Sequence, residues 1–521
     1  MSRFFRCRAR SGEHTGIEVA VGKRRVLVVT TAAAVAAAAV TVAATGVLRP
    51  SHPGTAAAGE QSVTPSPSAT PSSTPTPSAA ASLDPVLAAV DSARATDAAE
   101  LARRIAGAGK SGGKVSAAVL SGQTGKLLYG SGADSALIPA STNKLLTSAT
   151  ALQLLGPQHR FTTKVVATAP LPTPAADPAS AGPTPTTGAK TTASKKKMTG
   201  SIVLIGGGDP YLAGDADRVT DPGQSSLESL SAATAKRLKK AGLTSVKLGY
   251  DASLFAGPAW NPHWPTGYAD VVTPTSALWA DEGRLYGAEG PRQSDPAKSA
   301  ANLFAAQLTK RGIKVSTVTT TDVNAKVAGA ADNQVAAVES LSLEKIVERL
   351  LMASDNDATE VLLRQASLAA GGDGSITSGV ATVRKTLGKL GAWVGSTHTY
   401  DGSGLSRSNR VSADQLVRVI DLAVSGKQPR LSPLMTGLPV AGVEGSLHYR
   451  FSQSAAAGGR GLVRAKTGTL SQVHSLAGYS YTRDGELLVY AFVVNQPKND
   501  WASVAWLDRV SAAVATCGCR S

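Results

Sequence analysis

The sequence has few cysteines and no histidine pattern typical of a catalytic site. Three cysteines in 521 residues are too few for a disulfide framework. Cys517 and Cys519 stand near the C-terminal end, where either a bond between them or two free thiols fits the spacing. The seven histidines are scattered, and none forms an H-E-x-x-H pair. The sequence therefore argues against a zinc peptidase and against a Ser-His-Asp enzyme.

The chain is also short of acidic residues, because Lys and Arg outnumber Asp and Glu by 53 to 37, for a net charge of +16. A basic protein suits nucleic acid, an anionic cell wall or a membrane surface. Aromatic residues make up only 4% of the chain and are not interleaved with basic ones. Single-strand-binding platforms depend on that interleaving, and zinc-finger spacing is absent. We therefore expect no nucleic-acid partner.

The first 82 residues predict export. Lys23, Arg24 and Arg25 precede an apolar run over 26–48 that is long enough to span a bilayer, and these charges favour a cytoplasmic N-terminus. Residues 1–48 are then either a cleaved signal peptide or a membrane anchor. Residues 49–82 are rich in Pro, Ser and Thr and predict an extended linker. We expect an extracytoplasmic protein of the cell envelope, secreted or tethered to the membrane.

The rest of the chain predicts a folded α/β (α+β) region. Apolar runs with a period of two predict antiparallel strands, and longer amphipathic patterns predict helices near both ends. Strands are expected over 115–120, 126–129, 201–205, 462–468, 475–482 and 486–494, and helices over 84–105, 141–155, 343–352 and 501–514. A second low-complexity stretch occupies 167–197. The pattern favours an antiparallel sheet flanked by helices.

Three short motifs occur in order along this region. They are S-T-N-K at 141–144, S-D-N at 354–356 and K-T-G at 466–468, with Thr469 following the third. Each alone has an ordinary structural interpretation: an N-cap serine before a solvated lysine, a helix cap, and an edge-strand lysine. The ordered set is typical of penicillin-binding proteins and class A β-lactamases.

The first motif has the chemistry of a serine nucleophile. A spacing of three residues places Ser141 and Lys144 on one face of a helix. A serine hydroxyl needs an adjacent base, and a lysine can serve when burial lowers its pKa. The helix N-terminus also directs N–H groups toward an oxyanion formed beside Ser141. The pair therefore predicts acyl transfer.

From about residue 83 to 519, the chain resembles the low-molecular-mass class C penicillin-binding proteins, the D-alanyl-D-alanine carboxypeptidase/endopeptidase family. The similar segments are L-I-P-A-S-T-N-K-L at 137–145, G-G-G-D-P at 206–210, Y-D-G-S-G-L-S-R at 400–407, L-P-V-A-G-V at 438–443 and R-A-K-T-G-T-L at 464–470. The resemblance implies a penicillin-binding/transpeptidase-like domain that carries a smaller inserted domain. We expect 83–162 and 294–521 to form the first and 163–293 the second.

The resemblance implies three catalytic residues. Ser141 would be the acylated nucleophile and Lys144 its general base. Ser354 would pass the proton to the leaving group.

It also implies the substrate contacts. Asn356 would contact the peptide amide, and Lys466 and Thr467 would hold the terminal carboxylate of the substrate. Gly468, which has no side chain, would let the substrate approach the strand closely. The backbone N–H groups of Ser141 and Thr469 would form the oxyanion hole. The segment 401–407 would either line the site or form a glycine-rich structural turn.

The implied substrates are peptidoglycan stem peptides that end in D-Ala-D-Ala, or the cross-links made from them. β-Lactams would acylate Ser141 and act as inhibitors, and no metal or organic cofactor is expected. Two alternatives stay open. One is a β-lactamase, although no deacylation base can be identified; the other is a wall-binding module that has lost catalysis.

Overall fold

The computed structural model describes residues 95–171, 199–285, 287, 290–323 and 329–519. The chain divides into a unit of residues 1–82 and a unit of residues 83–521, and the described residues all belong to the second. The predictions for 1–82, and most of the low-complexity stretch at 167–197, lie outside the described residues. Within the described ranges, no helix is both long and apolar enough to cross a membrane.

The first sheet is antiparallel throughout. Its strand order is β2 (Leu127–Ser131), β1 (Lys114–Ser121), β10 (Leu487–Asn495), β9 (Val473–Tyr481) and β8 (Arg464–Leu470). Alternate side chains of a strand point to opposite faces. On β10, Val489 and Ala491 accordingly pack in one core, while Tyr490 and Phe492 pack in another. Both faces of this sheet are therefore buried.

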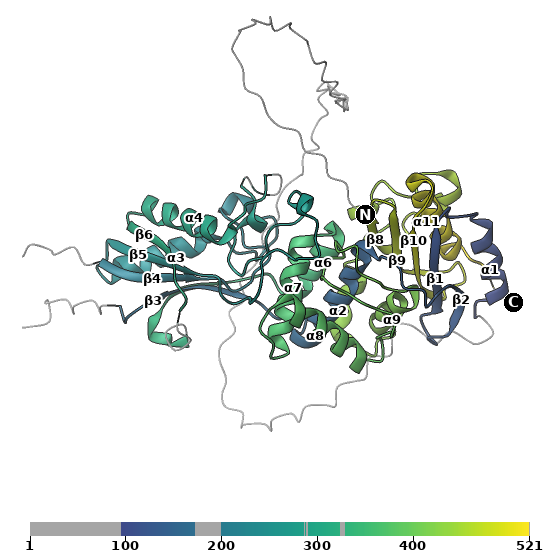
Figure 1. Cartoon of the computed structure of the whole chain (residues 1–521), viewed down its shortest axis with the longest axis horizontal. Helices are drawn as coiled ribbons and strands as arrows, with labels where there is room; N and C mark the ends of the chain where they lie inside the picture. Colours follow the sequence, from purple (N-terminus) through teal and green to yellow (C-terminus); the bar gives the residue numbers. More distant parts are fainter. Residues whose placement is uncertain (1–94, 172–198, 286, 288–289, 324–328, 520–521) are drawn as a thin grey trace, which may run out of the picture. The chain divides into compact units, whose positions relative to one another are not determined.

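Helices cover the two faces, as Figure 1 shows. One face packs on the two helices from the ends of the folded unit, α1 (Ala98–Gly107) and α11 (Asp500–Ala515). The other face packs on α9 (Ala413–Val424), which contacts β1, β9 and β10. Its core continues among the helices α2 (Lys144–Leu155), α6 (Leu343–Ala353), α7 (Asn356–Ala369), α8 (Ile376–Lys389) and α10 (Pro433–Thr436). The predicted α/β class is confirmed. The disulfide between Cys517 and Cys519 follows α11.

A second sheet has its own core. Its strand order is β6 (Lys314–Thr320), β5 (Ser245–Asp251), β4 (Thr199–Ile205), β3 (Thr162–Ala167) and β7 (Gln334–Glu339). Strands β4, β5 and β6 are parallel, and β3 is antiparallel to both its neighbours. Helices α3 (Leu227–Lys240) and α4 (Pro296–Lys310) pack on it through residues such as Leu230 and Phe304.

The second sheet extends past the expected end of the insertion at residue 293. Parallel strands need a crossover between them, and α4 is part of the connection from β5 to β6. The expected boundary at residue 293 therefore falls within one sheet, whose strand β7 ends at Glu339.

Most predicted elements overlap observed ones, with differences at their ends. The expected first helix spans 84–105, of which 84–94 lie outside the described residues; the described part begins α1 at Ala98, where Asp97 caps it by accepting a hydrogen bond from the Ala99 N–H. The helix expected at Ser141 begins as a 3₁₀ turn, η2 (Ala140–Asn143), and becomes α-helical at Lys144.

Candidate active site

The three motifs meet around two buried lysines. Lys144 Nζ donates to Ser141 Oγ at 3.0 Å, to Asn356 Oδ1 at 2.7 Å and to the Ser403 carbonyl at 2.8 Å. Lys466 Nζ donates to Ser354 Oγ at 2.8 Å. Both lysine side chains are fully buried, whereas Ser141 is half-buried. The fold therefore places a half-buried serine hydroxyl directly beside a buried amine.

The first motif lies in a constrained turn. Ala140 has a φ of 49°, which is the left-handed region that a non-glycine residue seldom adopts. Gly404, with a φ of 88°, packs directly against this turn, and a Cβ on it would lie 1.9 Å from the Ala140 carbonyl oxygen. The turn places the Ser141 hydroxyl at the start of α2, on the same face as Lys144.

The second motif connects two helices, as the sequence predicts. Ser354 ends α6 in the left-handed conformation, with a φ of 59°. Asp355 then caps α7 by accepting a hydrogen bond from the Ala358 N–H at 3.1 Å. The sharp junction lets Ser354 reach Lys466 while Asn356 reaches Lys144.

The third motif lies on β8, the last strand of the first sheet. Gly468 is required there, because a Cβ would come within 2.1 Å of Ser475 Oγ, 2.7 Å of the Pro139 carbonyl oxygen and 3.1 Å of the Ser141 nitrogen. Thr467 Oγ1 is hydrogen-bonded to Ser446 Oγ at 2.8 Å. The side chain of Thr469 is exposed at the end of the strand.

Burial makes both lysines weaker bases than usual. It lowers the pKa of Lys144 from 10.5 to about 8, against the opposing effect of nearby carboxylates, of which Asp355 is the strongest. The pKa of Lys466 is lowered well below 10.5, first by burial and then by the charge of Lys144. A substantial fraction of Lys144 is therefore neutral near pH 8 and able to accept a proton.

The segment 401–407 is a turn that supports the site and is buried from Asp401 to Ser406. Glu360 Oε1 accepts hydrogen bonds from the N–H groups of Gly402 and Ser403, at 3.0 and 2.7 Å. The side-chain amide of Asn143 donates to the carbonyls of Asp401 and Gly402. These contacts hold the Ser403 carbonyl against Lys144. The segment is therefore a structural turn, and the main-chain carbonyl of Ser403 brings it into contact with Lys144.

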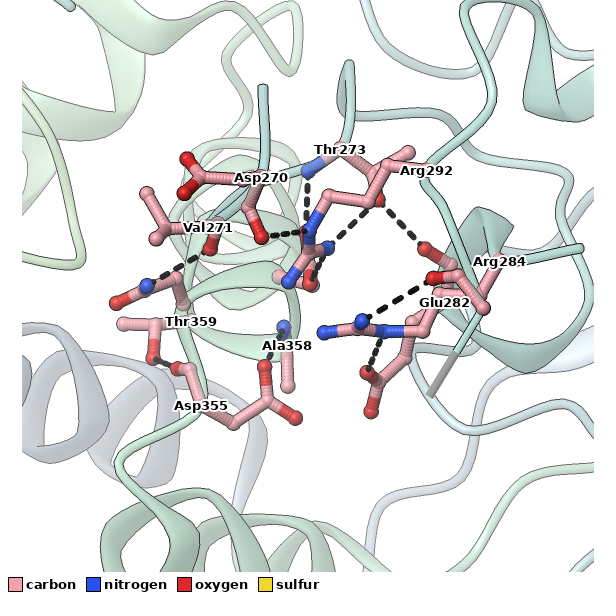
Figure 2. Close-up of polar contacts among 12 residues, drawn as sticks. Asp270, Val271, Thr273, Glu282, Arg284, Arg292, Asp355, Ala358 and Thr359 are labelled. Atoms are coloured by element: carbon pink, nitrogen blue, oxygen red, sulfur yellow. Dashed lines mark hydrogen bonds and ion pairs between the residues drawn. The ribbon is translucent and has the colours of Figure 1, made fainter. Parts of the chain in front are cut away.

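A loop of the insertion also reaches the site. The side-chain amide of Asn356 donates to the Val271 carbonyl at 2.9 Å. Arg292 holds this loop by donating to the Asp270 carbonyl at 3.2 Å and to Thr273 Oγ1 at 2.8 Å (Figure 2). It also forms an ion pair with Asp357, whose Oδ1 accepts the Thr273 N–H at 2.7 Å.

An acidic cluster lies beside this loop. Carboxylate oxygens of Glu282, Asp355 and Asp357 lie within 4.8 Å of one another. Each has a partner within the protein: Arg292 pairs with Asp357, Tyr211 donates to Asp355 at 3.0 Å, and Arg284 lies 3.7 Å from Glu282. Arg292 and Tyr211 therefore pair with two of the three carboxylates, Arg284 forms a longer ion pair with the third, and we assign the cluster no metal.

Sequence reasoning missed two contacts of the site, Val271 and Ser446. Val271 contributes a main-chain carbonyl, which no side-chain pattern marks, whereas Ser403 lies in the segment 401–407 that the sequence singled out. Ser446 contributes a hydroxyl beside Thr467 and follows closely on the similar segment 438–443. All eight of the expected site residues are nevertheless brought together by the fold.

Comparisons with known proteins cover this same region. The model of the D-Ala-D-Ala carboxypeptidase 3 (S13) family matches residues 98–177, 184–291 and 287–512. These segments contain all three motifs and both sheets.

Two curated relatives and one solved structure are similar over most of their length. A carboxypeptidase of Mycobacterium tuberculosis is 31% identical over 78% of this chain and 81% of its own. The D-alanyl-D-alanine carboxypeptidase of an Actinomadura species is 28% identical over 75% of this chain and 79% of its own. Penicillin binding protein 4 of Haemophilus influenzae has a similar fold, with a TM-score of 0.61, 18% identity, and coverage of 81% of this chain and 100% of its own.

Proposed function

Since the chain belongs to the D-Ala-D-Ala carboxypeptidase 3 (S13) family and is a serine peptidase, we propose that Ser141 and Lys144 are the nucleophile and base of its active site. The observation that carries the proposal is the 3.0 Å contact from a fully buried lysine, with a pKa of about 8, to the half-buried serine hydroxyl. A lysine in this state can remove the serine proton at neutral pH.

Acylation follows from these positions. Ser141 Oγ attacks the carbonyl of the penultimate D-alanine as its proton passes to Lys144 Nζ. The N–H groups of Ser141 and Thr469 stabilise the oxyanion. The carbon–nitrogen bond then breaks, Ser354 relays a proton to the leaving amine, and D-alanine departs. Water hydrolyses the acyl-enzyme by the same steps and restores the serine.

Substrate binding uses the third motif and Asn356. Lys466 and Thr467 hold the terminal carboxylate of the substrate, and the negative charge of that carboxylate favours the protonated form of Lys466, which then donates charge-assisted hydrogen bonds. Asn356 already uses its oxygen for Lys144 and its nitrogen for Val271. An amide can accept two and donate two hydrogen bonds, so it keeps one of each for the peptide amide.

The enzyme is a D-alanyl-D-alanine carboxypeptidase. We propose that it acts on peptidoglycan outside the cytoplasm, that it also cleaves cross-links as an endopeptidase, and that it binds β-lactams. We further propose that residues 1–48 export the chain and either tether it to the membrane or are cleaved, and that 49–82 form a linker to the folded unit. Acylation of Ser141 by a β-lactam opens the strained ring and leaves a covalent ester.

Fluorescent penicillin and a stem pentapeptide test the assignment. The wild type should become labelled and release D-alanine, and Ser141→Ala should do neither. Ser148→Ala is the matched control, because Ser148 is buried in the same helix and its hydroxyl has no hydrogen-bond partner among the described residues. Labelling that persists in Ser141→Ala would refute the assignment. Rapid turnover of penicillin would favour the β-lactamase alternative, and an unlabelled wild type the non-catalytic one.

A further inference from the structure

A cavity of about 970 Å³ adjoins the second and third motifs. Its wall includes Ala353, which directly precedes Ser354, and Ser446, which is hydrogen-bonded to Thr467. From there it extends along α6, past Met352 and Lys345, to Thr436 on α10. The cavity therefore begins where the active-site motifs end.

The direction of the substrate places this cavity on the leaving-group side. With the oxyanion at Thr469 and the terminal carboxylate at Lys466 and Thr467, the acyl part lies toward Thr469 and the leaving group toward Thr467. Ser446 is hydrogen-bonded to Thr467 and lines the cavity. A group attached to the leaving amine beside Thr467 would then lie next to Ser446 and the mouth of the cavity.

The wall of the cavity suits a peptide. Apolar surface from Leu341 and Met352 alternates with charges of both signs in ion pairs. Arg349 pairs with Asp221 at 2.6 Å, and Lys345 with Glu348 at 2.7 Å. A polyanion would meet two carboxylates here, and the lining residues include no aromatic ring on which a sugar could stack. A peptide chain with amides, amines and carboxylates matches this mixture.

We propose that this cavity binds the acceptor stem peptide of a cross-link, which is the leaving group when the enzyme acts as an endopeptidase. The inference rests on the proposed function, because it uses the same nucleophile. Ser141 Oγ forms an ester with the D-alanine carbonyl, and the bond from that carbonyl to the side-chain amine of the acceptor peptide breaks. The proton from Ser141 ends on that amine, and water later releases the acyl group.

Filling the cavity tests the proposal. In the full-length protein, Thr436→Trp and Lys345→Trp each place a large ring at an exposed position of the wall. Rates are measured on a cross-linked dimeric muropeptide and on a monomeric pentapeptide. We expect the ratio of cross-link cleavage to D-alanine release to fall about tenfold, in keeping with a steric effect on one substrate. Thr377→Trp is the control, because Thr377 is exposed on α8 and outside the cavity.

Each outcome decides the question. An unchanged ratio in both cavity variants would overturn the proposal, whether the two rates stay constant or fall together. A ratio that falls equally in Thr377→Trp would also overturn it. Failure of the proposed function would look different, because the wild type would then neither release D-alanine nor become labelled at Ser141.

Discussion

Asn356 donates from its side-chain amide to the Val271 carbonyl at 2.9 Å, across the boundary between α7 and the insertion. Its other end accepts a hydrogen bond from Lys144 at 2.7 Å. Because nitrogen and oxygen have different partners, the carbonyl of Val271 determines which end of the amide faces the lysine. The insertion therefore helps to orient the active site.

Loosening the loop around Val271 should slow acylation. Arg292→Met alone would leave Asp357 buried and unpaired, which costs about 3–5 kcal/mol of stability. The double variant Arg292→Met/Asp357→Asn removes both charges and keeps an acceptor for the Thr273 N–H. We expect it to fold and to acylate with penicillin about tenfold more slowly, with a changed pH profile.

Thermal unfolding and stopped-flow acylation check this prediction. A folded double variant with the wild-type rate and pH profile would show that the loop does not orient Asn356.

The acylation rate should rise with pH through about 8. Because burial lowers the pKa of Lys144 to about 8, the fraction of Lys144 that is neutral and can accept a proton increases as the pH rises through this value. Asp355→Asn should move the rise to lower pH, because the Asp355 carboxylate is the strongest charge that raises the pKa of Lys144. Asparagine can still cap α7.

Penicillin acylation measured from pH 6 to 10 would show the shift. Asp373→Asn, at an exposed position, should leave the profile unchanged. A rise that stays in place or moves upward in Asp355→Asn would contradict the electrostatic account.

A methyl group on Gly468 should damage catalysis. Its Cβ would meet Ser475 Oγ and the Pro139 carbonyl and push β8 away from Ser141. A displacement of about 1 Å can cost about 10²-fold in rate, and we expect a loss of that order for Gly468→Ala. Gly395→Ala, whose Cβ would have no neighbour within 4 Å, should retain the wild-type rate. Equal rates in the two variants would mean that close packing at Gly468 is not needed.

Glu360 should make the fold less stable as pH rises. Burial, and then the charge of Asp401, raises its pKa from 4.5 to about 7. The folded state thus binds more protons than the unfolded state between these values, so stability falls as pH rises through them. Glu360→Gln keeps an acceptor for the N–H groups of Gly402 and Ser403 and removes the ionisation.

Chemical denaturation at pH 5 and pH 7 measures the effect. The stability of Glu360→Gln relative to the wild type should be greater at pH 7 than at pH 5. Glu339→Gln, at an exposed site on β7, should show no such difference. A relative stability that is the same at both pH values would contradict the prediction.

The strands and motifs could be predicted because their signals are local. Strand β10 is a continuous apolar run that follows a turn, and residues adjacent along the chain carry that signal. Such a run is typical of a strand buried on both faces, and Val489 and Tyr490 do pack in opposite cores. The extent of the insertion could not be predicted in this way. Strands β6 and β7 join their sheet through pairing partners that are distant along the chain, such as β5 and β3.

The sequence by itself predicted Ser141 and Lys144 as nucleophile and base, because they lie within one helical turn and the S-D-N and K-T-G motifs follow them in order. Only the tertiary structure decided what surrounds them. Lys144 becomes a weak base through burial, and it contacts Asn356, which is 212 positions away along the chain. The carbonyls of Ser403 and Val271 complete the site, and a main-chain carbonyl is the same in every residue, so its position depends on the fold alone.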